Sequence, residues 1–555
     1  MDPFLKREIR TVQPAVPFHA SLYHYHHTWA KTFHSRPELY IQPETVEEIH
    51  KLVTLARRCR RRIVTVGSGH SPSDLTCTSS WMVNLDKYSK ILSLNRKTKV
   101  VTMQAGIRLR DLCAKLREEG LSMPNLGSIN EQSIAGAIST ATHGSSTRHG
   151  ILSQSVLGLK IMLSNGRVVT CSAEHNPDLF RAALVSLGAL GIITEVTFQA
   201  VDTFNIAWHQ TLVPMKDILE QWNKNLWTEK EFTRVWWMPY MKKAIKWTAE
   251  KTNKPAQKTK SSWLRGALGF HSYHTLLWIS NWFPRLLPLL ERYVITVQYG
   301  NAEGGGSYGV EEGQSGLLMN CLYSQFVNEW AIPLSKGPEA ITRLSDWLKF
   351  DQAASRIPFD PTGLYVHAPI EVRVSDTSTA HPRPYLDNTV PDEPTLYLNA
   401  TLYRPYGSDP PCHERYYEAF EWLMKEMGGR PHWAKNIDHV TREETHKMYP
   451  NMSDWLRVRE EVDPEGMFIG DWHRRYLVPE DEAKHILPLE ERHVKTEAAK
   501  EGGLIWYGEI PGRALSPQNS EESFDLMHGV EAEKSMIFES DSSIHSDGTE
   551  TLHVH

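Results

Sequence analysis

Hydrophobic residues recur with the period of an α-helix at two places in the first 120 residues. Between residues 44 and 58, the apolar side chains that share one helical face are Ile49, Leu52, Val53 and Leu55. Between residues 108 and 119 the face consists of Leu109, Leu112, Cys113 and Leu116, and Gly120 follows where a helix would end. Apolar residues at i, i+3, i+4 and i+7 lie on one side of a helix. The spacing therefore predicts two amphipathic helices.

Segments rich in β-branched and apolar residues alternate with these helices. Four of them are expected to be single strands: residues 63–66, 82–85, 100–103 and 192–198. Residues 157–171 are expected to form a hairpin, because Asn165-Gly166 is a strong signal for a tight turn between two strands. Strands and helices interspersed in this way predict an α+β domain over residues 21–203.

Three other stretches differ from this domain in their residue pattern. Residues 1–20 are expected to be a flexible N-terminal arm. Beyond residue 204 aromatic residues become dense, as in Trp236-Trp237, and mixed strands and helices continue to residue 435, which predicts a second domain. Residues 479–555 are expected to be a disordered tail, because after Arg513 they hold nine acidic residues, one lysine and few large apolar residues.

Composition argues against several functional classes. At 555 residues, 40% hydrophobic and 23% charged, the chain has the size and composition of a globular protein with two domains and tails. A formal net charge of −5 without a basic stripe gives no case for nucleic-acid binding. The six cysteines lack the spacing of a zinc site or a disulfide framework, which predicts a reducing, intracellular compartment and no metal site. The first residues carry acids and no apolar run, so no cleavable signal is expected.

A glycine-rich turn follows the strand predicted at residues 63–66. It reads Val66-Gly67-Ser68-Gly69-His70-Ser71, and Pro72 occupies the position of the third glycine in a dinucleotide-binding fingerprint. Glycine lets the backbone approach a ligand closely, so the turn predicts a cofactor cradle. A second loop, residues 133–144, is small, rich in hydroxyl groups and nearly uncharged. Each loop alone is typical of a tight turn, but the two together favour a pyrophosphate site.

These loops resemble the FAD-binding domain of the vanillyl-alcohol-oxidase/p-cresol-methylhydroxylase (PCMH) superfamily. With residues 125–129 and 186–192 they are similar to the sugar-lactone oxidases of that superfamily, and the resemblance spans about residues 20–478. It implies a two-subdomain FAD-binding domain of the PCMH type over residues 21–203, followed by an α+β cap domain for the substrate over residues 204–435. Residues 463–468 resemble the family's closing motif, which implies that residues 436–478 return to the FAD domain.

The resemblance implies FAD as the cofactor and His70 as its covalent attachment site. The family bonds a histidine at this position to the 8α carbon of the flavin, and relatives with leucine there hold FAD non-covalently. A ring-nitrogen substituent makes the flavin a better hydride acceptor. From the residue alone, His70 could equally be a turn histidine that bonds the backbone. The other flavin contacts that the resemblance implies are Val66, Gly67, Ser68, Gly69, Ser71, Gly127, Ser128, Ile129, Ser133, Gly136, Ser139, Thr140, His143, Gly144, Gly191 and Ile192.

Gly127 is expected to set the reaction with oxygen. In the lactone-oxidising relatives this position lies near the flavin, where glycine marks oxidases and alanine marks a dehydrogenase that reacts poorly with O2. The physical reason is space, because the missing methyl group leaves a route for O2. Ser128 resembles a contact for a substrate hydroxyl group. His143 could be a flavin contact or an ordinary loop histidine.

Glu371, Arg373 and Lys435 are the predicted catalytic residues, together with Ser128. Alternate residues on a strand share a face, so Glu371 and Arg373 can point into one pocket. Such a pair is most often a solvated ion pair. The resemblance implies that the carboxylate holds substrate hydroxyl groups and that the guanidinium stabilises negative charge on the reduced flavin, with Lys435 helping. The family motif around Lys435 commonly has glycine where this chain has Ala434.

The resemblance therefore implies a flavoprotein oxidase. The C2–H of an aldono-1,4-lactone would pass as hydride to flavin N5, giving an ascorbate-type enediol lactone, and O2 would be reduced to hydrogen peroxide. One alternative is a dehydrogenase that passes electrons to a cytochrome, against which His70 and Gly127 argue. Another is a non-catalytic protein that binds FAD or a lactone, against which the three residues Glu371, Arg373 and Lys435 argue. The resemblance also implies association with the mitochondrial outer membrane.

Residues 242–290 suggest peripheral membrane binding. Residues 242–265 hold eight Lys or Arg against the single acid Glu250, and an aromatic run follows at residues 276–283. The run is well short of the roughly 20 apolar residues that a membrane span needs. A basic segment beside a Trp, Phe and Leu face suits a helix that lies in a membrane interface. The alternative is a core helix of the cap domain that follows a basic loop.

Overall fold

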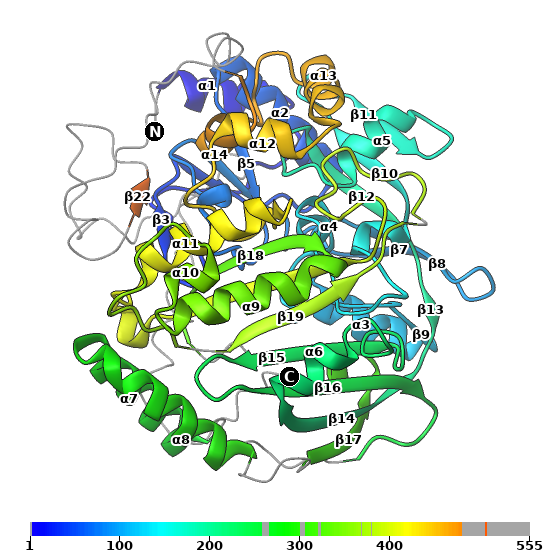
Figure 1. The fold of residues 1–555 in the computed structure, drawn as a ribbon. Coiled ribbons are helices and arrows are strands. Elements are labelled where there is room, and N and C mark those ends of the chain that lie inside the picture. The colour runs from blue at the N-terminus through cyan, green and yellow to red at the C-terminus, as the bar shows by residue number, and fades with distance from the viewer. Residues whose placement is uncertain are drawn as a thin grey trace.

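The computed structural model describes residues 3–257, 266–299, 306–319, 323–367, 369–378, 380–479 and 505–507. The chain forms two α+β domains that lie against each other (Figure 1). The first, blue to cyan in the figure, precedes the second, which is green to yellow. The last helices, in orange, lie back against the first domain. The predicted α+β class with two domains is confirmed.

A four-stranded sheet and the helix α2 (Val46–Cys59) form the first half of the first domain. The strand order is β1 (Ala20–Ser21), β4 (Leu39–Ile41), β6 (Trp81–Asn84) and β5 (Ile63–Val66), and β4 and β5 both run parallel to β6. Helix α2 begins where the Thr45 side chain accepts a hydrogen bond from Glu48 N, a standard N-cap. Its four predicted face residues are all fully buried. The sequence prediction is confirmed here.

A five-stranded antiparallel sheet forms the second half of this domain. Its order is β11 (Val168–Ser172), β10 (Val156–Met162), β12 (Ile192–Gln199), β8 (Val100–Gln104) and β7 (Ile91–Asn95). The predicted hairpin is β10 and β11, with Gly166 at a φ of +83° in its turn. Around the sheet lie α3 (Leu109–Glu118), α4 (Ile134–Ser139) and α5 (Pro177–Ala183), and β9 (Leu121–Ser122) pairs with β13 (Val201–Asp202).

The N-terminal residues do not form a flexible arm over their described part. Residues 3–11 form helix α1 (Pro3–Thr11), and Leu5, Ile9 and Val12 are buried in the core of the first domain. These apolar residues recur at i, i+4 and i+7, so they form one face that packs near α2. Lys51 Nζ donates to Val16 O at 2.6 Å and holds the following turn. The prediction for residues 1–20 is therefore wrong from residue 3 onward.

An eight-stranded antiparallel sheet is the framework of the second domain. Its order is β17 (Gly306–Glu312), β14 (Asn205–Pro214), β16 (Lys243–Thr252), β15 (Phe232–Met238), β19 (Ile370–Ser375), β20 (Thr395–Tyr403), β18 (Gln325–Pro333) and β21 (Arg430–Pro431). Helices α6 (Met215–Gln221), α9 (Gly337–Leu348), α10 (Gln352–Ser355) and α11 (His413–Glu426) lie over one side of it (Figure 1). The other side carries the polar residues described below.

A helical hairpin, α7 (Ala267–Trp282) and α8 (Leu287–Tyr299), lies along the outer edge of the second domain (Figure 1). Its inner side buries Tyr273, Leu277, Leu287 and Val294. Its outer side leaves large apolar side chains in solvent, and Leu268 and Trp282 are 78% and 72% exposed. The hairpin therefore packs in the second domain through one face, as the alternative of a core helix requires, while its other face is exposed. Among the described residues, no helix is long and apolar enough to cross a membrane.

The end of the described chain returns to the first domain through α12 (Arg442–Met448), α13 (Met452–Val462) and α14 (Asp471–Tyr476). Ile63 N donates to Met467 O, and Ser164 Oγ donates to Val462 O, both at 2.8 Å. The disordered tail predicted at residues 479–555 lies outside the described residues, except for residue 479 and β22 (Ile505–Tyr507). This short strand runs parallel to β3 (Phe33–Ser35), which also pairs with β2 (His26–His27), so the prediction is wrong at these three residues.

Candidate active site

Two adjoining cavities contain most of the residues singled out from the sequence. The first lies in the first domain and is lined, among others, by Val66, Gly67, Ser68, Gly69, His70, Ser71, Ser133, Gly136, Ser139, Thr140 and Gly191. The second lies against the eight-stranded sheet and is lined, among others, by His70, Ser71, Gly127, Ser128, Ile129, His143, Glu371, Arg373 and Lys435. His70 and Ser71 belong to both linings. The tertiary structure thus brings together loops that are far apart in the sequence.

The first cavity has the features of a cofactor cradle. A Cβ atom on Gly67 would lie 2.7 Å from Ser133 Oγ, so a side chain there would narrow the space between the two glycine-rich loops. Gly69 has a φ of +65°, which favours glycine. Thr65 Oγ1 is buried and has no hydrogen-bond partner within the described part of the chain. A polar ligand in this cavity would supply that partner, so the residues present fit an FAD molecule.

Two predicted flavin contacts lie outside both linings. Ile192 is fully buried in β12 opposite Met162, and its neighbour Ile193 lines the first cavity instead. Gly144 packs against Asn125, and a Cβ atom there would lie only 2.1 Å from Asn125 Oδ1. The predictions for these two residues are corrected accordingly. A strand exposes alternate residues to one side, which explains the shift by one position at Ile193.

His70 lies at the boundary between the two cavities. Its ring stacks on Trp29, with centroids 5.3 Å apart and planes inclined by 17°. No hydrogen bond joins the ring to a backbone group within the described residues, so the alternative of a backbone-bonded turn histidine finds no support. Burial, followed by the nearby charges of Arg108 and Lys435, lowers the pKa of His70 to about 4. The ring is therefore neutral at neutral pH.

Three neighbouring strands carry the polar wall of the second cavity. Glu371 of β19 lies opposite Asn399 of β20, and Asn399 lies opposite Glu329 of β18, so the three form a row across the sheet. Arg373 Nη1 donates to Ser128 Oγ at 3.3 Å, and Arg373 Nε lies 3.4 Å from Glu371 Oε2. Arg373 is only 5% exposed. The alternative of a solvated surface ion pair is therefore wrong.

Glu329 is a residue of this site that the sequence did not indicate. It is fully buried and forms an ion pair with Arg373. Its carboxylate also lies 3.3 Å from His143 Nε2 and 3.8 Å from Lys435 Nζ. Burial opposes the charge, but Arg373, His143 and Lys435 together hold the pKa of Glu329 well below its usual value. The only signal in the sequence was one acidic residue within an otherwise largely apolar strand, without any indication of its partners.

His143 and His432 complete this buried cluster. His143 stacks on Tyr397 with ring centroids 3.4 Å apart, and burial and then Arg373 lower its pKa. The ligand atoms of His143, Glu329 and His432 lie within 4.8 Å of one another, as in a metal site. Arg373 and Lys435 already neutralise Glu329 and would repel a cation. The charges therefore suit an ion-pair network better than a metal ion.

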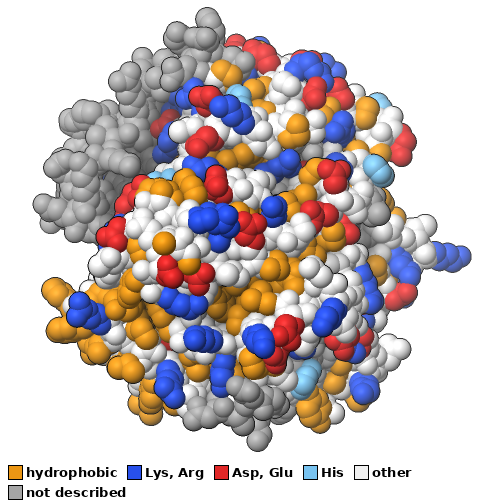
Figure 2. Space-filling model, in the orientation of Figure 1, with side chains coloured by type: hydrophobic (Ala, Val, Ile, Leu, Met, Phe, Trp, Pro, Cys, Tyr) orange, Lys and Arg blue, Asp and Glu red, His pale blue; other side chains and the backbone are white. Residues whose placement is uncertain are grey.

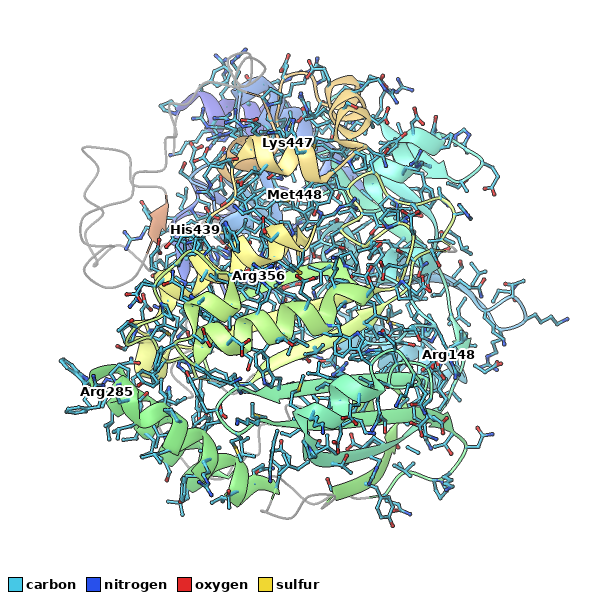
Figure 3. All side chains as sticks on the ribbon, in the orientation of Figure 1. Arg148, Arg285, Arg356, His439, Lys447 and Met448 are labelled. Atoms are coloured by element: carbon cyan, nitrogen blue, oxygen red, sulfur yellow. The ribbon has the colours of Figure 1, made fainter. Side chains whose placement is uncertain are left out.

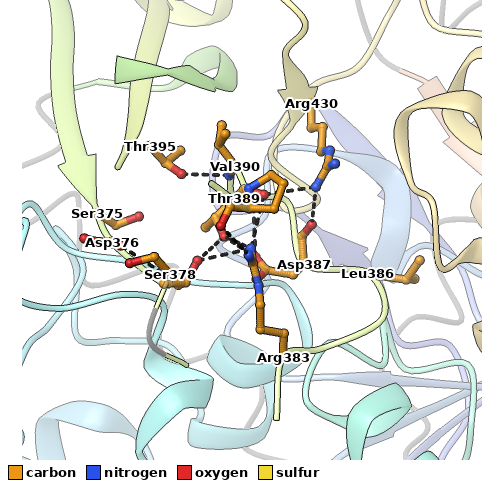
Figure 4. A network of polar contacts seen from close by, with 12 residues as sticks. Ser375, Asp376, Ser378, Arg383, Leu386, Asp387, Thr389, Val390, Thr395 and Arg430 are labelled. Carbon is orange, nitrogen blue, oxygen red and sulfur yellow. Dashed lines mark hydrogen bonds and ion pairs between the residues drawn. The ribbon is translucent and has the colours of Figure 1, made fainter. Parts of the chain in front are cut away.

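The segment that carries Lys435 is held from both sides. His432 N donates to Glu329 O at 2.9 Å, and Trp433 Nε1 donates to Leu386 O at 2.9 Å. Figure 4 shows a polar network that includes Arg430, which precedes this segment and donates to the backbone oxygens of residues 387 and 389. In the same network Arg383 points at the carboxylate of Asp387 and the hydroxyl of Thr389. Ala434, where the resembling family has glycine, fits here without strain because it is buried at a negative φ.

The chain matches two family models along its length. Residues 37–172 match the FAD binding domain, and residues 196–476 match D-arabinono-1,4-lactone oxidase. A Neurospora crassa relative is 51% identical over an alignment of 516 positions, which covers 88% of this chain and 93% of the relative. The chain belongs to the D-arabinono-1,4-lactone oxidase family. The resemblance inferred from the sequence is thereby confirmed.

Other members of this family are similar over most of their length. Proteins named D-arabinono-1,4-lactone oxidase from Yarrowia lipolytica and Eremothecium gossypii are 41% and 39% identical, over 81% and 80% of this chain and 96% and 94% of theirs. Among solved structures, a cholesterol oxidase from Brevibacterium sterolicum has a TM-score of 0.67 at 17% identity, covering 84% of this chain and 99% of the oxidase. That likeness shows the fold alone.

Proposed function

We propose that this protein is an FAD-dependent oxidase that acts on an aldono-1,4-lactone similar to D-arabinono-1,4-lactone. The product would be an ascorbate-type enediol lactone similar to D-erythroascorbate, with O2 reduced to hydrogen peroxide. The observation that carries the proposal is the contact between Arg373, Glu371 and Ser128 in a cavity that shares His70 with the cofactor cradle. The names of the relatives support the same substrate class.

FAD would be held by the two glycine-rich loops and bonded covalently to His70. Gly67 and Gly136 leave room for it beside Ser133, and Ser139 and Thr140 line the same cavity. The neutral ring of His70 leaves a nitrogen lone pair for the bond, which supports this part of the proposal. When bound, FAD supplies the two-electron acceptor and the reaction with O2.

The residues of the second cavity would bind and orient the lactone. Glu371 lines the cavity and can accept hydrogen bonds from substrate hydroxyl groups, and Ser128 can donate or accept one. Arg373 is a permanent cation, because burial lowers its pKa less than Glu329 and Glu371 raise it. In a buried site a fixed cation would stabilise the negative charge that hydride transfer brings to the acceptor, which would lower the barrier to the transfer.

Two other functions fit the fold less well. A dehydrogenase that passes electrons to a cytochrome would gain nothing from the space at Gly127, which lines the second cavity without a side chain. A non-catalytic binding protein would have no need for the permanent cation Arg373 to be buried among carboxylates, since removing charges from water is costly.

The deciding test is anaerobic reduction of the purified, flavin-loaded protein by D-arabinono-1,4-lactone and other sugar lactones. Arg373→Ala is expected to slow the reduction by roughly 10²–10³-fold, the usual cost of losing one charge-stabilising group. Glu371→Gln should weaken lactone binding as well. Arg343→Ala is the matched control, because Arg343 is also buried but bonds Ser355 O beside α9. A wild-type rate in Arg373→Ala would remove this arginine from the mechanism.

The proposal includes peripheral attachment to the mitochondrial outer membrane through residues 242–290. The hairpin α7–α8 supports it, because Trp282, Phe283 and Leu289 are 72%, 62% and 66% exposed. Figure 2 shows hydrophobic side chains gathered at this edge with basic ones among them. Arg285, between the two helices, lies at the outer edge of the molecule in Figure 3. Apolar side chains with nearby cations suit the surface of an anionic membrane. Of the basic residues, Lys243, Lys246 and Lys251 lie on β16, and residues 258–265 lie outside the described part.

A further inference from the structure

Glu329 stands behind the second cavity rather than in it. It is fully buried, and its side chain does not belong to the cavity lining, whereas Glu371 and Arg373 do. A lactone in the cavity could therefore reach Glu371 but not Glu329. The carboxylate of Glu329 pairs with charged or basic groups of the protein, although its Oε2 atom accepts no hydrogen bond from the described residues.

Those groups are three side chains of the site. Glu329 forms an ion pair with Arg373 Nη2, and lies 3.3 Å from His143 Nε2 and 3.8 Å from Lys435 Nζ. All three partners line the second cavity. They come from β19, from the loop after α4 and from the segment after β21, so a single carboxylate connects three separate parts of the chain.

The geometry of the guanidinium group explains what this contact does. Arginine presents its N–H groups in a rigid planar fork, so fixing one nitrogen also fixes the directions of the others. With Nη2 on Glu329, Nη1 points to Ser128 Oγ at 3.3 Å and Nε faces Glu371 at 3.4 Å. Without Glu329, the buried cation would have Glu371 as its nearest anion and would turn toward it. That rotation would occupy the carboxylate assigned above to substrate hydroxyl groups.

The balance of charge at the second cavity also indicates a role for Glu329. Arg373 and Lys435 bring two positive charges to the wall of the cavity, and Glu371 supplies one negative charge among the residues that line it. Burying a charge is costly unless it is paired, and Arg373 is buried whereas Lys435 is partly exposed, so Arg373 in particular needs a close anion. Glu329 supplies it without taking space from the substrate.

We infer that Glu329 is a positioning residue of the lactone site, which fixes the guanidinium of Arg373 in the wall of the second cavity and leaves the carboxylate of Glu371 accessible to substrate hydroxyl groups. This inference rests on the proposed function. It assigns the recognition of the lactone to Glu371 and Ser128, and the alignment of the cation to a residue that never touches the ligand. The backbone carbonyl of Glu329 also accepts a hydrogen bond from His432 N at 2.9 Å, and a change of the Glu329 side chain leaves this bond in place.

The test compares Glu329→Gln with Glu421→Gln. Glu421 is also fully buried, but its carboxylate accepts from Asn328 Nδ2 at 2.6 Å and from Asp438 N at 2.9 Å, away from the cavity. Glu329→Gln should slow anaerobic flavin reduction on the order of 10²-fold, the effect of misplacing a reacting group by about 1 Å. It should also raise the dissociation constant of the lactone. The midpoint potential of the bound flavin should rise, because an anion near it is lost. Glu421→Gln should leave all three unchanged.

A second variant covers the case in which Glu329→Gln does not fold. Glu329→Asp keeps the negative charge but shortens the side chain, so the midpoint potential should stay near the wild-type value while reduction is slowed. A folded Glu329→Gln with the reduction rate and potential of the wild type would overturn the inference, and so would wild-type reduction in Glu329→Asp. A wild-type protein that no sugar lactone reduces would instead contradict the proposed function. The shift in potential would then still test the electrostatic role of Glu329.

Discussion

The indole of Trp29 lies almost parallel to the imidazole of His70, with ring centroids 5.3 Å apart. Trp29 N also donates to Gly69 O at 2.7 Å, so the tryptophan holds both the turn and the ring that follows it. Burial lowers the pKa of His70 to about 4, with smaller contributions from Arg108 and Lys435. A flat, neutral and fixed imidazole between the two cavities supports the proposed covalent bond to the flavin.

We expect the flavin to stay with the protein after acid denaturation. The pellet of the wild type should remain yellow, whereas His70→Ala should fold but release its flavin into the supernatant. His27→Ala is the control, because His27 borders the turn at Gly69 without lining either cavity. Complete release of flavin from the wild type would show that the attachment is not covalent.

The second prediction concerns Gly127 and oxygen. A Cβ atom on Gly127 would lie 3.0 Å from Thr142 Cγ2, so an added methyl group would fill the space at the cavity wall. Gly127→Ala should therefore slow reoxidation by O2 far more than reduction by the lactone. Stopped-flow absorbance separates the two half-reactions, and equal changes in both would contradict the oxygen-route argument.

A double variant distinguishes a blocked route from simple crowding at the same place. Overpacking a core costs about 1–3 kcal/mol, and Thr142→Ser removes the methyl group that Gly127→Ala would meet. The double variant should regain thermal stability, because the crowding is relieved. Its reaction with O2 should stay slow if the new methyl group itself obstructs the route.

The third prediction concerns the hairpin α7–α8 and membranes. Trp282→Ser with Phe283→Ser should weaken co-sedimentation with vesicles of phosphatidylcholine and anionic phosphatidylserine, because it removes two exposed aromatic side chains. High salt or carbonate should at least partly release the wild type. Leu92→Ser with Leu157→Ser is the control, since these residues are also exposed but lie on β7 and β10. Wild-type protein that never binds such vesicles would contradict the idea.

The fourth prediction is a dependence of the hairpin on pH. Glu291 of α8 accepts a hydrogen bond from Tyr240 N, and burial raises its pKa from 4.5 to about 8 although backbone hydrogen bonds oppose the shift. Glu291 lines a third, small cavity beneath the hairpin, and His367 and Tyr273 line it as well. The carboxyl group of Glu291 is therefore neutral in the folded hairpin below about pH 8. Its contribution to the stability of the hairpin is complete below pH 4.5 and is lost as the pH rises through about 8.

Hydrogen exchange measures this effect directly. After correction for intrinsic rates, residues 267–299 should be less protected at pH 9 than at pH 6, and the difference should largely disappear in Glu291→Gln. Helix α9 on the other side of the sheet should show no such change. Equal loss of protection in both regions would indicate global unfolding and contradict the assignment to Glu291.

Local features of the fold were predictable because their causes lie close together in the sequence. Helix α2 has its apolar face and its Thr45 cap within one segment, and the turn at Gly166 needs only its own glycine. The glycine-rich turn at residues 67–69 was recognised for the same reason. The N-terminal arm was misjudged although Leu5 and Ile9 show helical spacing, because their burial depends on the rest of the domain.

The candidate site, too, could be predicted only in part from the sequence. The spacing of Glu371 and Arg373 alone predicted that both point to one face, because a strand repeats every two residues. Glu329 lies 42 positions before Glu371, and only the pairing of β18 with β20 and of β20 with β19 places the two acids in one row. A strand does not specify its partner or its register by its own pattern, and a shift of one residue would turn Glu329 to the opposite face. The sequence by itself therefore determined which residue types the site contains, whereas the charge that aligns Arg373 was decided only when distant strands paired.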